Sequence, residues 1–212
     1  MIQRETIRRE ISNCLTGTEN LGLPGGRKGK VRDIYDLGDR LLLITTDRQS
    51  AFDRVLAAVP FKGQVLNTVS AWWFENTSHI VPNHVISIPH PNATLAKKVE
   101  VFPVEFIMRG YLTGSTSTSA WTLYNKGERN ICGNVLPDGM RKNQKFPRPI
   151  ITPTTKSEEH DESITPEGIV ETGLMSREDW EKASDIAFRL FRHGMDTAAD
   201  NGLILVDTKY EM

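Results

Sequence analysis

The segment Gly29–Arg32 combines a glycine with basic side chains at alternate positions. Glycine lets a backbone approach a phosphate closely, and Lys30 and Arg32 point to the same side of the chain if the segment is extended. The spacing is not that of a Walker loop, and glycine–lysine turns are common on protein surfaces. The segment therefore predicts a phosphate-binding turn, with an ordinary surface turn as the alternative.

Two further polar segments lie at the ends of expected strands, where loops commonly build sites. Asp47 and Asp53 follow an apolar strand and could contact a ligand or accept hydrogen bonds from backbone amides. Both interpretations stay open. Arg109 and Ser115 lie where a strand ends and a helix is expected to start. Because amides at a helix N-terminus attract anions, this segment predicts a phosphate cradle, the alternative being a capped helix beside a solvated arginine.

Residues 152–162 bring a lysine, a histidine and several carboxylates into one loop. Such a cluster is more often a solvated charged loop than a site. Its His160 has no second histidine at ligand spacing, so it predicts no metal site by itself.

The last expected strand carries Asp207, Lys209 and Glu211 on one face, because side chains alternate along a strand. Carboxylate oxygens suit Mg²⁺ and an ammonium group suits phosphate, so the row predicts a magnesium–nucleotide site. A ladder of ion pairs across neighbouring strands is the alternative.

Periodicity and turn signals predict the elements that position these residues. A capping box at Ser176 opens a long helix that Gly202 ends, whereas residues 143–168 lack apolar periodicity and are expected to form a long loop. The strand-rich first part and the mixed second part indicate an α+β fold. The other expected elements are a hairpin of Val31–Asp36 and Leu41–Thr46, helices over 64–75 and 116–126, buried strands over 84–88 and 104–108, and a strand over 203–211.

Composition excludes several classes of protein. The 212 residues include 26 Lys and Arg against 27 Asp and Glu, which is ordinary for a globular chain and does not support a general nucleic-acid binder. The apolar runs are too short to span a membrane, and the N-terminus lacks the apolar centre of a secretory signal, so a cytoplasmic protein is expected. Cys14 and Cys132 are expected to be reduced thiols.

Taken in order, the motifs resemble those of the SAICAR synthetase family, the phosphoribosylaminoimidazole-succinocarboxamide synthases of purine biosynthesis. The resemblance spans nearly the whole chain, and several separated motifs in the right order are more specific than any one of them. They are Gly29–Tyr35, Thr46–Arg48 with Ser50–Asp53, Lys62-Gly63, Pro103–Glu105 with Arg109, Thr113–Ser115, Thr152–Lys156 through Glu162, and Val206–Glu211.

The resemblance implies an ATP-dependent ligase. Such an enzyme joins the carboxylate of a carboxy-aminoimidazole ribotide (CAIR) to the amine of L-aspartate with Mg²⁺ and ATP, most simply through an acyl phosphate. It also implies a strand-rich nucleotide-binding part over residues 1–102, with an antiparallel sheet like that of a kinase N-lobe. This part would pack on a mixed α/β part over 103–212, with ATP in the cleft between them.

The resemblance assigns roles to particular residues. Those matching the ATP-binding positions are Gly29, Lys30, Arg32, Asp207, Lys209 and Glu211, of which Asp207 and Glu211 would also hold the metal. Those matching the substrate-binding positions are Asp47, Ser50, Arg109, Gly114 and Ser115. Those matching the positions near the reacting groups are Lys156, Asp161 and Lys209.

Family members are expected to continue past the last strand with an Asp-Glu pair and a Pro-Asp-Ser-Ser-Arg stretch, whereas this sequence ends at Met212. A metal-binding carboxylate and a substrate-binding arginine are therefore expected to be missing. A kinase-like phosphotransferase for small molecules and an ATP-binding fragment without turnover are the alternatives. The sequence does not determine the oligomeric state, and a homo-oligomer is one option.

Overall fold

The computed structural model describes residues 3–23, 25–51, 54–156 and 162–212. The chain divides into two compact units, Met1–Val99 and Glu100–Met212, each of which is described by itself. Among the described helices, none is both long and apolar enough to cross a membrane.

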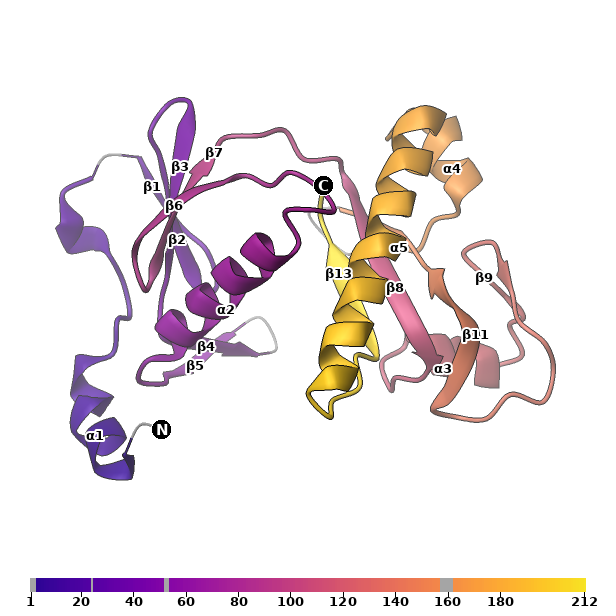
Figure 1. The fold of residues 1–212 in the computed structure, drawn as a ribbon, viewed down its shortest axis with the longest axis horizontal. Coiled ribbons are helices and arrows are strands. Elements are labelled where there is room, and N and C mark those ends of the chain that lie inside the picture. Colours follow the sequence, from indigo (N-terminus) through magenta and orange to yellow (C-terminus); the bar gives the residue numbers. More distant parts are fainter. Residues whose placement is uncertain (1–2, 24, 52–53, 157–161) are drawn as a thin grey trace. The chain divides into compact units, whose positions relative to one another are not determined.

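The N-terminal unit is built on a five-stranded antiparallel sheet of order β1-β2-β3-β7-β6 (Figure 1). Helix α2, Lys62–Asn76, packs against β3, β6 and β7. The remaining elements are a hairpin of β4 and β5, helix α1 and two short 3₁₀ turns. The bounds are β1 Gly26–Lys28, β2 Arg32–Asp36, β3 Arg40–Thr45, β4 Arg48–Ala51, β5 Arg54–Ala58, β6 Val85–His90, β7 Ala93–Lys97, α1 Arg4–Arg9, and 3₁₀ turns Glu10–Asn13 and Glu19–Leu21.

The C-terminal unit is built around the long strand β8, Val104–Leu112. Strands β11, β12 and β13 all pair with it in antiparallel fashion, and helix α5 crosses one face of the sheet (Figure 1). The bounds are α3 Ala120–Asn125, β9 Asn130–Ile131, β10 Asn134–Val135, β11 Gln144–Ile151, β12 Thr154–Thr155, α4 Pro166–Glu171, α5 Arg177–Asp200 and β13 Asp207–Tyr210.

The alternation of side chains along β8 separates a core face from a polar face. Val104, Phe106 and Met108 are fully buried in the main apolar cluster with residues of α5, and the Phe106 ring stacks on Trp180 with ring centroids 5.3 Å apart. Glu105, Ile107 and Arg109 point to the opposite face, where they line a pocket. The strand therefore carries the core and the candidate site on opposite sides.

The structure confirms the β2–β3 hairpin and the helices over 64–75 and after Ser176, whose hydroxyl accepts a hydrogen bond from the Asp179 amide at 3.0 Å. The expectation of a long loop over 143–168 is wrong, since β11, β12 and α4 lie there. Prolines at 147 and 149 and a register shift between Lys145 and Ile150 disturb the alternation that would have identified β11.

Two other expected elements are present but differ in detail from the prediction. The helix expected over 116–126 begins only at Ala120, because the Ser119 hydroxyl donates to the Thr116 carbonyl at 2.9 Å and stabilises a turn there. Strand β6 is mostly exposed rather than buried, since it is the edge strand of the sheet.

Candidate active site

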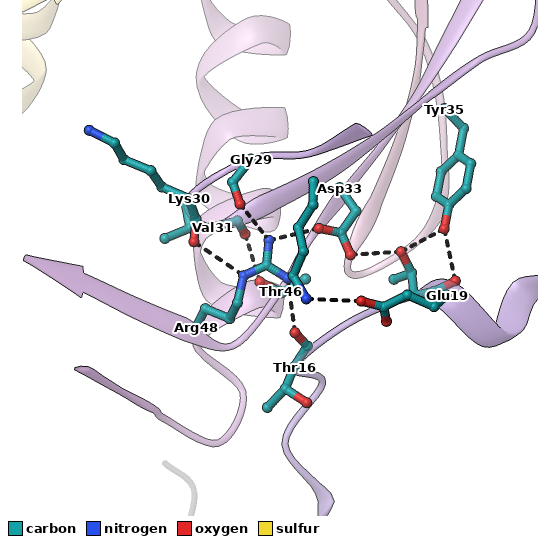
Figure 2. Close-up of polar contacts among 11 residues, drawn as sticks. Thr16, Glu19, Gly29, Lys30, Val31, Asp33, Tyr35, Thr46 and Arg48 are labelled. Carbon is teal, nitrogen blue, oxygen red and sulfur yellow. Dashed lines mark hydrogen bonds and ion pairs between the residues drawn. The ribbon is translucent and has the colours of Figure 1, made fainter. Parts of the chain in front are cut away.

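Gly29 and Lys30 of the first motif lie in the turn between β1 and β2 (Figure 2), and Arg32 is the first residue of β2. The Gly29 amide donates to the Arg32 carbonyl at 2.7 Å. A Cβ atom at position 29 would lie 2.8 Å from that carbonyl oxygen, so the turn requires glycine. Lys30 and Arg32 are exposed. The turn and the start of β2 thus present two cations beside a closely folded backbone, as a phosphate-binding turn needs.

A buried ion pair lies directly beneath this turn. Arg48 Nη2 and Asp33 Oδ1 are 2.7 Å apart, and the two side chains are only 4% and 6% exposed. The guanidinium also donates to the carbonyls of Thr16, Gly29 and Lys30 at 2.9, 2.9 and 3.1 Å (Figure 2). The sequence motifs assigned no role to Arg48 or Asp33. The alternation of side chains along β2 could have identified Asp33 as buried, because Asp33 shares the buried face of this strand with Tyr35.

The environment of Asp33 predicts acid sensitivity. Burial alone would raise the pKa of Asp33, but hydrogen bonds from Arg48 and Thr18 outweigh it and hold the pKa below its usual value. A carboxyl with a lowered folded-state pKa stabilises the fold above its unfolded pKa of about 3.9, and this contribution is lost as the pH falls through the folded-state pKa. We therefore expect the free energy of unfolding to fall below about pH 4, measured by urea titration at a series of pH values.

The Asp33→Asn variant is the control for this prediction, because it cannot titrate at this position. Its stability should be lower at neutral pH and should fall less steeply between about pH 4 and pH 2. Equal slopes for the variant and the unsubstituted chain would contradict the prediction.

Asp47 is buried between the N-terminal segment and the start of α2. Its two carboxylate oxygens accept hydrogen bonds from the amides of Leu15 and Gly63, both at 2.8 Å. These bonds correspond to the alternative that the sequence left open, in which Asp47 satisfies backbone amides. Ser50, which was grouped with Asp47 as a substrate-binding residue, lies in β4 and is partly buried. Substrate contacts of these two residues stay predictions.

In the C-terminal unit, the polar face of β8 lines a pocket of about 130 Å³. Arg109 is held there by the hydrogen bond from its Nε to the Thr152 hydroxyl at 2.8 Å. Burial lowers the pKa of Arg109, and the neighbouring Asp207 acts in the opposite direction. Burial raises the pKa of the Cys132 thiol at the same pocket. A guanidinium in a small polar pocket is suited to binding an anionic group of a small molecule.

Strand β13 brings the last charged row alongside this pocket. Asp207 lies opposite Arg109 in the register of β13 and β8. Lys209 Nζ and Glu105 Oε1 are 2.5 Å apart, and Lys156 Nζ and Glu211 Oε2 are 2.8 Å apart. Lys209 and Glu211 of the row therefore take part in ion pairs, which was the alternative to a nucleotide site. These pairs also concentrate charge beside the pocket.

Glu105 is a site residue to which the sequence motifs gave no role. Its side chain is 5% exposed, and it also accepts a hydrogen bond from the Thr154 hydroxyl at 3.1 Å. A carboxylate inside the otherwise apolar run 104–108 is the signal that could have identified it, because a buried charge requires a partner.

The donor set for Mg²⁺ is partial. Over the described ranges, no group of three or more histidine, cysteine or carboxylate side chains could hold a metal ion. Asp207 and Glu211 supply hard oxygen donors, and Mg²⁺ is commonly held by one or two carboxylates together with phosphate oxygens of a nucleotide. The two residues therefore fit a metal that arrives with a nucleotide, and their assignment stays a prediction.

Three further residues were predicted as site residues: Gly114, Ser115 and Asp161. Gly114 and Ser115 are not among the described residues that line the pocket. Gly114 adopts a φ of +107°, and a Cβ atom there would lie 2.3 Å from Cβ of Ser119. Ser115 is exposed and precedes the start of α3 by five residues, so the expected helix N-terminus beside it is wrong. Asp161 lies outside the described residues.

Comparison with solved structures defines the class of fold. The SAICAR synthase of Saccharomyces cerevisiae in complex with SAICAR superimposes with a TM-score of 0.81 and 35% identity, covering 93% of this chain and 71% of that chain. A SAICAR synthetase in complex with ADP has a TM-score of 0.71 and 25% identity, covering 88% of this chain and 73% of that chain. The α+β fold is therefore that of the SAICAR synthases.

The sequence comparisons show the family. The SAICAR synthetase family model matches residues 26–212, and the chain belongs to this family. The phosphoribosylaminoimidazole-succinocarboxamide synthase of Legionella pneumophila (strain Lens) is 63% identical over 200 residues, an alignment that covers 93% of this chain and 63% of that relative. The chain thus spans less than two thirds of the length of this relative.

Proposed function

We propose that this protein is an ATP-dependent ligase that joins the carboxylate of CAIR to the amine of L-aspartate and yields SAICAR, ADP and phosphate. The observation that carries the proposal is the family match over residues 26–212, which contains every residue assigned to the site. The solved relatives bound to SAICAR and to ADP support a ribotide product and a nucleotide.

The reaction needs cations more than it needs a strong nucleophile. A carboxylate is a poor electrophile, so one of its oxygens attacks the γ-phosphorus of ATP and ADP leaves. The aspartate amine then attacks the acyl carbon, loses a proton, and displaces phosphate. Both steps gather negative charge, which preorganised cations stabilise. Mg²⁺ held with the nucleotide by Asp207 and Glu211 would neutralise phosphate charge.

The proposed roles are distributed over both parts of the chain. Gly29, Lys30 and Arg32 of the nucleotide-binding part, residues 1–102, contact the ATP phosphates. The part over 103–212 binds CAIR through Arg109, and Lys156, Asp161 and Lys209 lie near the reacting groups. Asp47, Ser50, Gly114 and Ser115 are proposed as further substrate-binding residues. The cytoplasmic location and a homo-oligomeric state remain predictions of the sequence.

The experiment that tests the function is ADP release from this chain with Mg²⁺, ATP, CAIR and aspartate, each substrate being omitted in turn. Release that requires CAIR and aspartate together supports the ligase. Release with a hydroxyl acceptor and without aspartate would instead support a phosphotransferase. ATP binding without turnover would support a nucleotide-binding module.

Two substitutions should separate the substrates. Lys30→Ala is expected to weaken binding of Mg²⁺–ATP, and Arg109→Ala is expected to weaken binding of CAIR, each by about 1–3 kcal/mol if one charge-assisted contact is lost. Titration calorimetry with each ligand measures both effects. Lys98→Ala is the matched control, because it removes an exposed lysine, paired with Asp36, from the same unit as Lys30. Unchanged affinities in the two site variants would contradict the assignment of Lys30 to ATP binding and of Arg109 to CAIR binding.

A further inference from the structure

The guanidinium of Arg48 points at the inner side of the Gly29–Val31 turn (Figure 2). It donates to two successive carbonyls of that turn, those of Gly29 and Lys30. Carbonyls in an exposed turn are usually solvated, whereas here a side chain that is 4% exposed binds them. The backbone of the turn is therefore set by a buried residue of β4.

Fixing these carbonyls also fixes the amides that follow them. In a trans peptide the carbonyl and the next N–H point in opposite directions, and the described residues contain no cis peptide. The N–H groups of Lys30 and Val31 therefore point away from Arg48. Successive N–H groups directed to one side form the kind of concavity that binds phosphate. In Figure 2 the side chain of Lys30 also extends away from Arg48.

The charge of Arg48 is already neutralised inside the protein. Asp33 pairs with it at 2.7 Å, so Arg48 does not act as a free cation for a ligand. Its contribution is geometric, because a planar guanidinium offers five N–H donors in a fixed arrangement and can bind several acceptors at once. Lysine in the same place could pair with Asp33 but could not reproduce this arrangement.

We propose that Arg48 is a positioning residue for nucleotide binding. It holds the Gly29–Val31 backbone in the conformation in which Lys30 and the turn amides meet the phosphates. This inference rests on the proposed function, since it assumes that the turn binds the phosphates of ATP. Arg48 itself does not touch the nucleotide.

The test compares two probes, Mg²⁺–ATP and adenosine, by titration calorimetry. In Arg48→Lys, affinity for Mg²⁺–ATP should fall roughly tenfold while affinity for adenosine is unchanged, because only the phosphates contact the turn. Arg129→Lys is the matched control. Arg129 also pairs with an aspartate, at 2.6 Å, and donates to the Tyr124 and Glu128 carbonyls, but it lies in the C-terminal unit.

A second variant keeps the test decisive if Arg48→Lys does not fold. Arg48→Gln combined with Asp33→Asn removes both buried charges together and should show the same loss that is specific to ATP. In the Lys30→Ala background, Arg48→Lys should cost less affinity for ATP than it does alone, because part of its effect acts through Lys30.

The outcomes separate this inference from the proposed function. If the unsubstituted chain binds no ATP, both are overturned. If it binds ATP and the two Arg48 variants weaken ATP and adenosine equally, or weaken neither, only the positioning role is overturned. Strict additivity with Lys30→Ala would also overturn it.

Discussion

Replacing Arg48 with methionine is expected to lower the free energy of unfolding by about 3–5 kcal/mol. The substitution leaves Asp33 as a buried carboxylate without its partner, since the two side chains are 4% and 6% exposed. It also removes the donors to the carbonyls of Thr16, Gly29 and Lys30. Urea unfolding monitored by circular dichroism, with hydrogen exchange to locate the effect in the N-terminal unit, measures the loss.

The double variant Arg48→Met with Asp33→Asn is the informative control. Removing the second charge should restore part of the lost stability, because an uncharged amide costs less to bury than an unpaired carboxylate. Full additivity of the two single effects would contradict the interpretation of a coupled buried pair.

Replacing Asp47 with alanine is expected to cost about 2–4 kcal/mol, because two buried amides lose their acceptors at once. These amides belong to Leu15 and Gly63, so the change loosens both the N-terminal segment and the start of α2. Asp47→Asn should cost about half as much, since its remaining carbonyl oxygen can accept one of the two bonds. Urea unfolding midpoints give both values.

Asp39→Ala supplies the matched control for Asp47. The Asp39 side chain is 80% exposed, and its removal should change the stability by less than about 0.5 kcal/mol. If Asp47→Ala were as mild as Asp39→Ala, the carboxylate would not organise the backbone, and its substrate role would gain support.

Local patterns were sufficient to predict much of the fold. Helices α2 and α5 and the β2–β3 hairpin lie where periodicity and turn residues placed them. Such elements depend on neighbours a few residues apart, which the sequence displays directly. Strand β11 escaped prediction because its pairing with β8 tolerates two prolines and a register shift, and neither leaves a periodic pattern.

The residues of the candidate site also form two groups, those that the sequence identified and those that only the tertiary structure identified. The sequence by itself determined the family motifs, the cations at Lys30 and Arg32, and the charged row of Asp207, Lys209 and Glu211, because these depend on residue type and short spacing. Only the tertiary structure paired Glu105 with Lys209, 104 residues apart, and placed Arg48 against the Gly29–Val31 turn. Burial decides such partners, since a charge removed from water must find an opposite charge or a hydrogen bond wherever the fold supplies one.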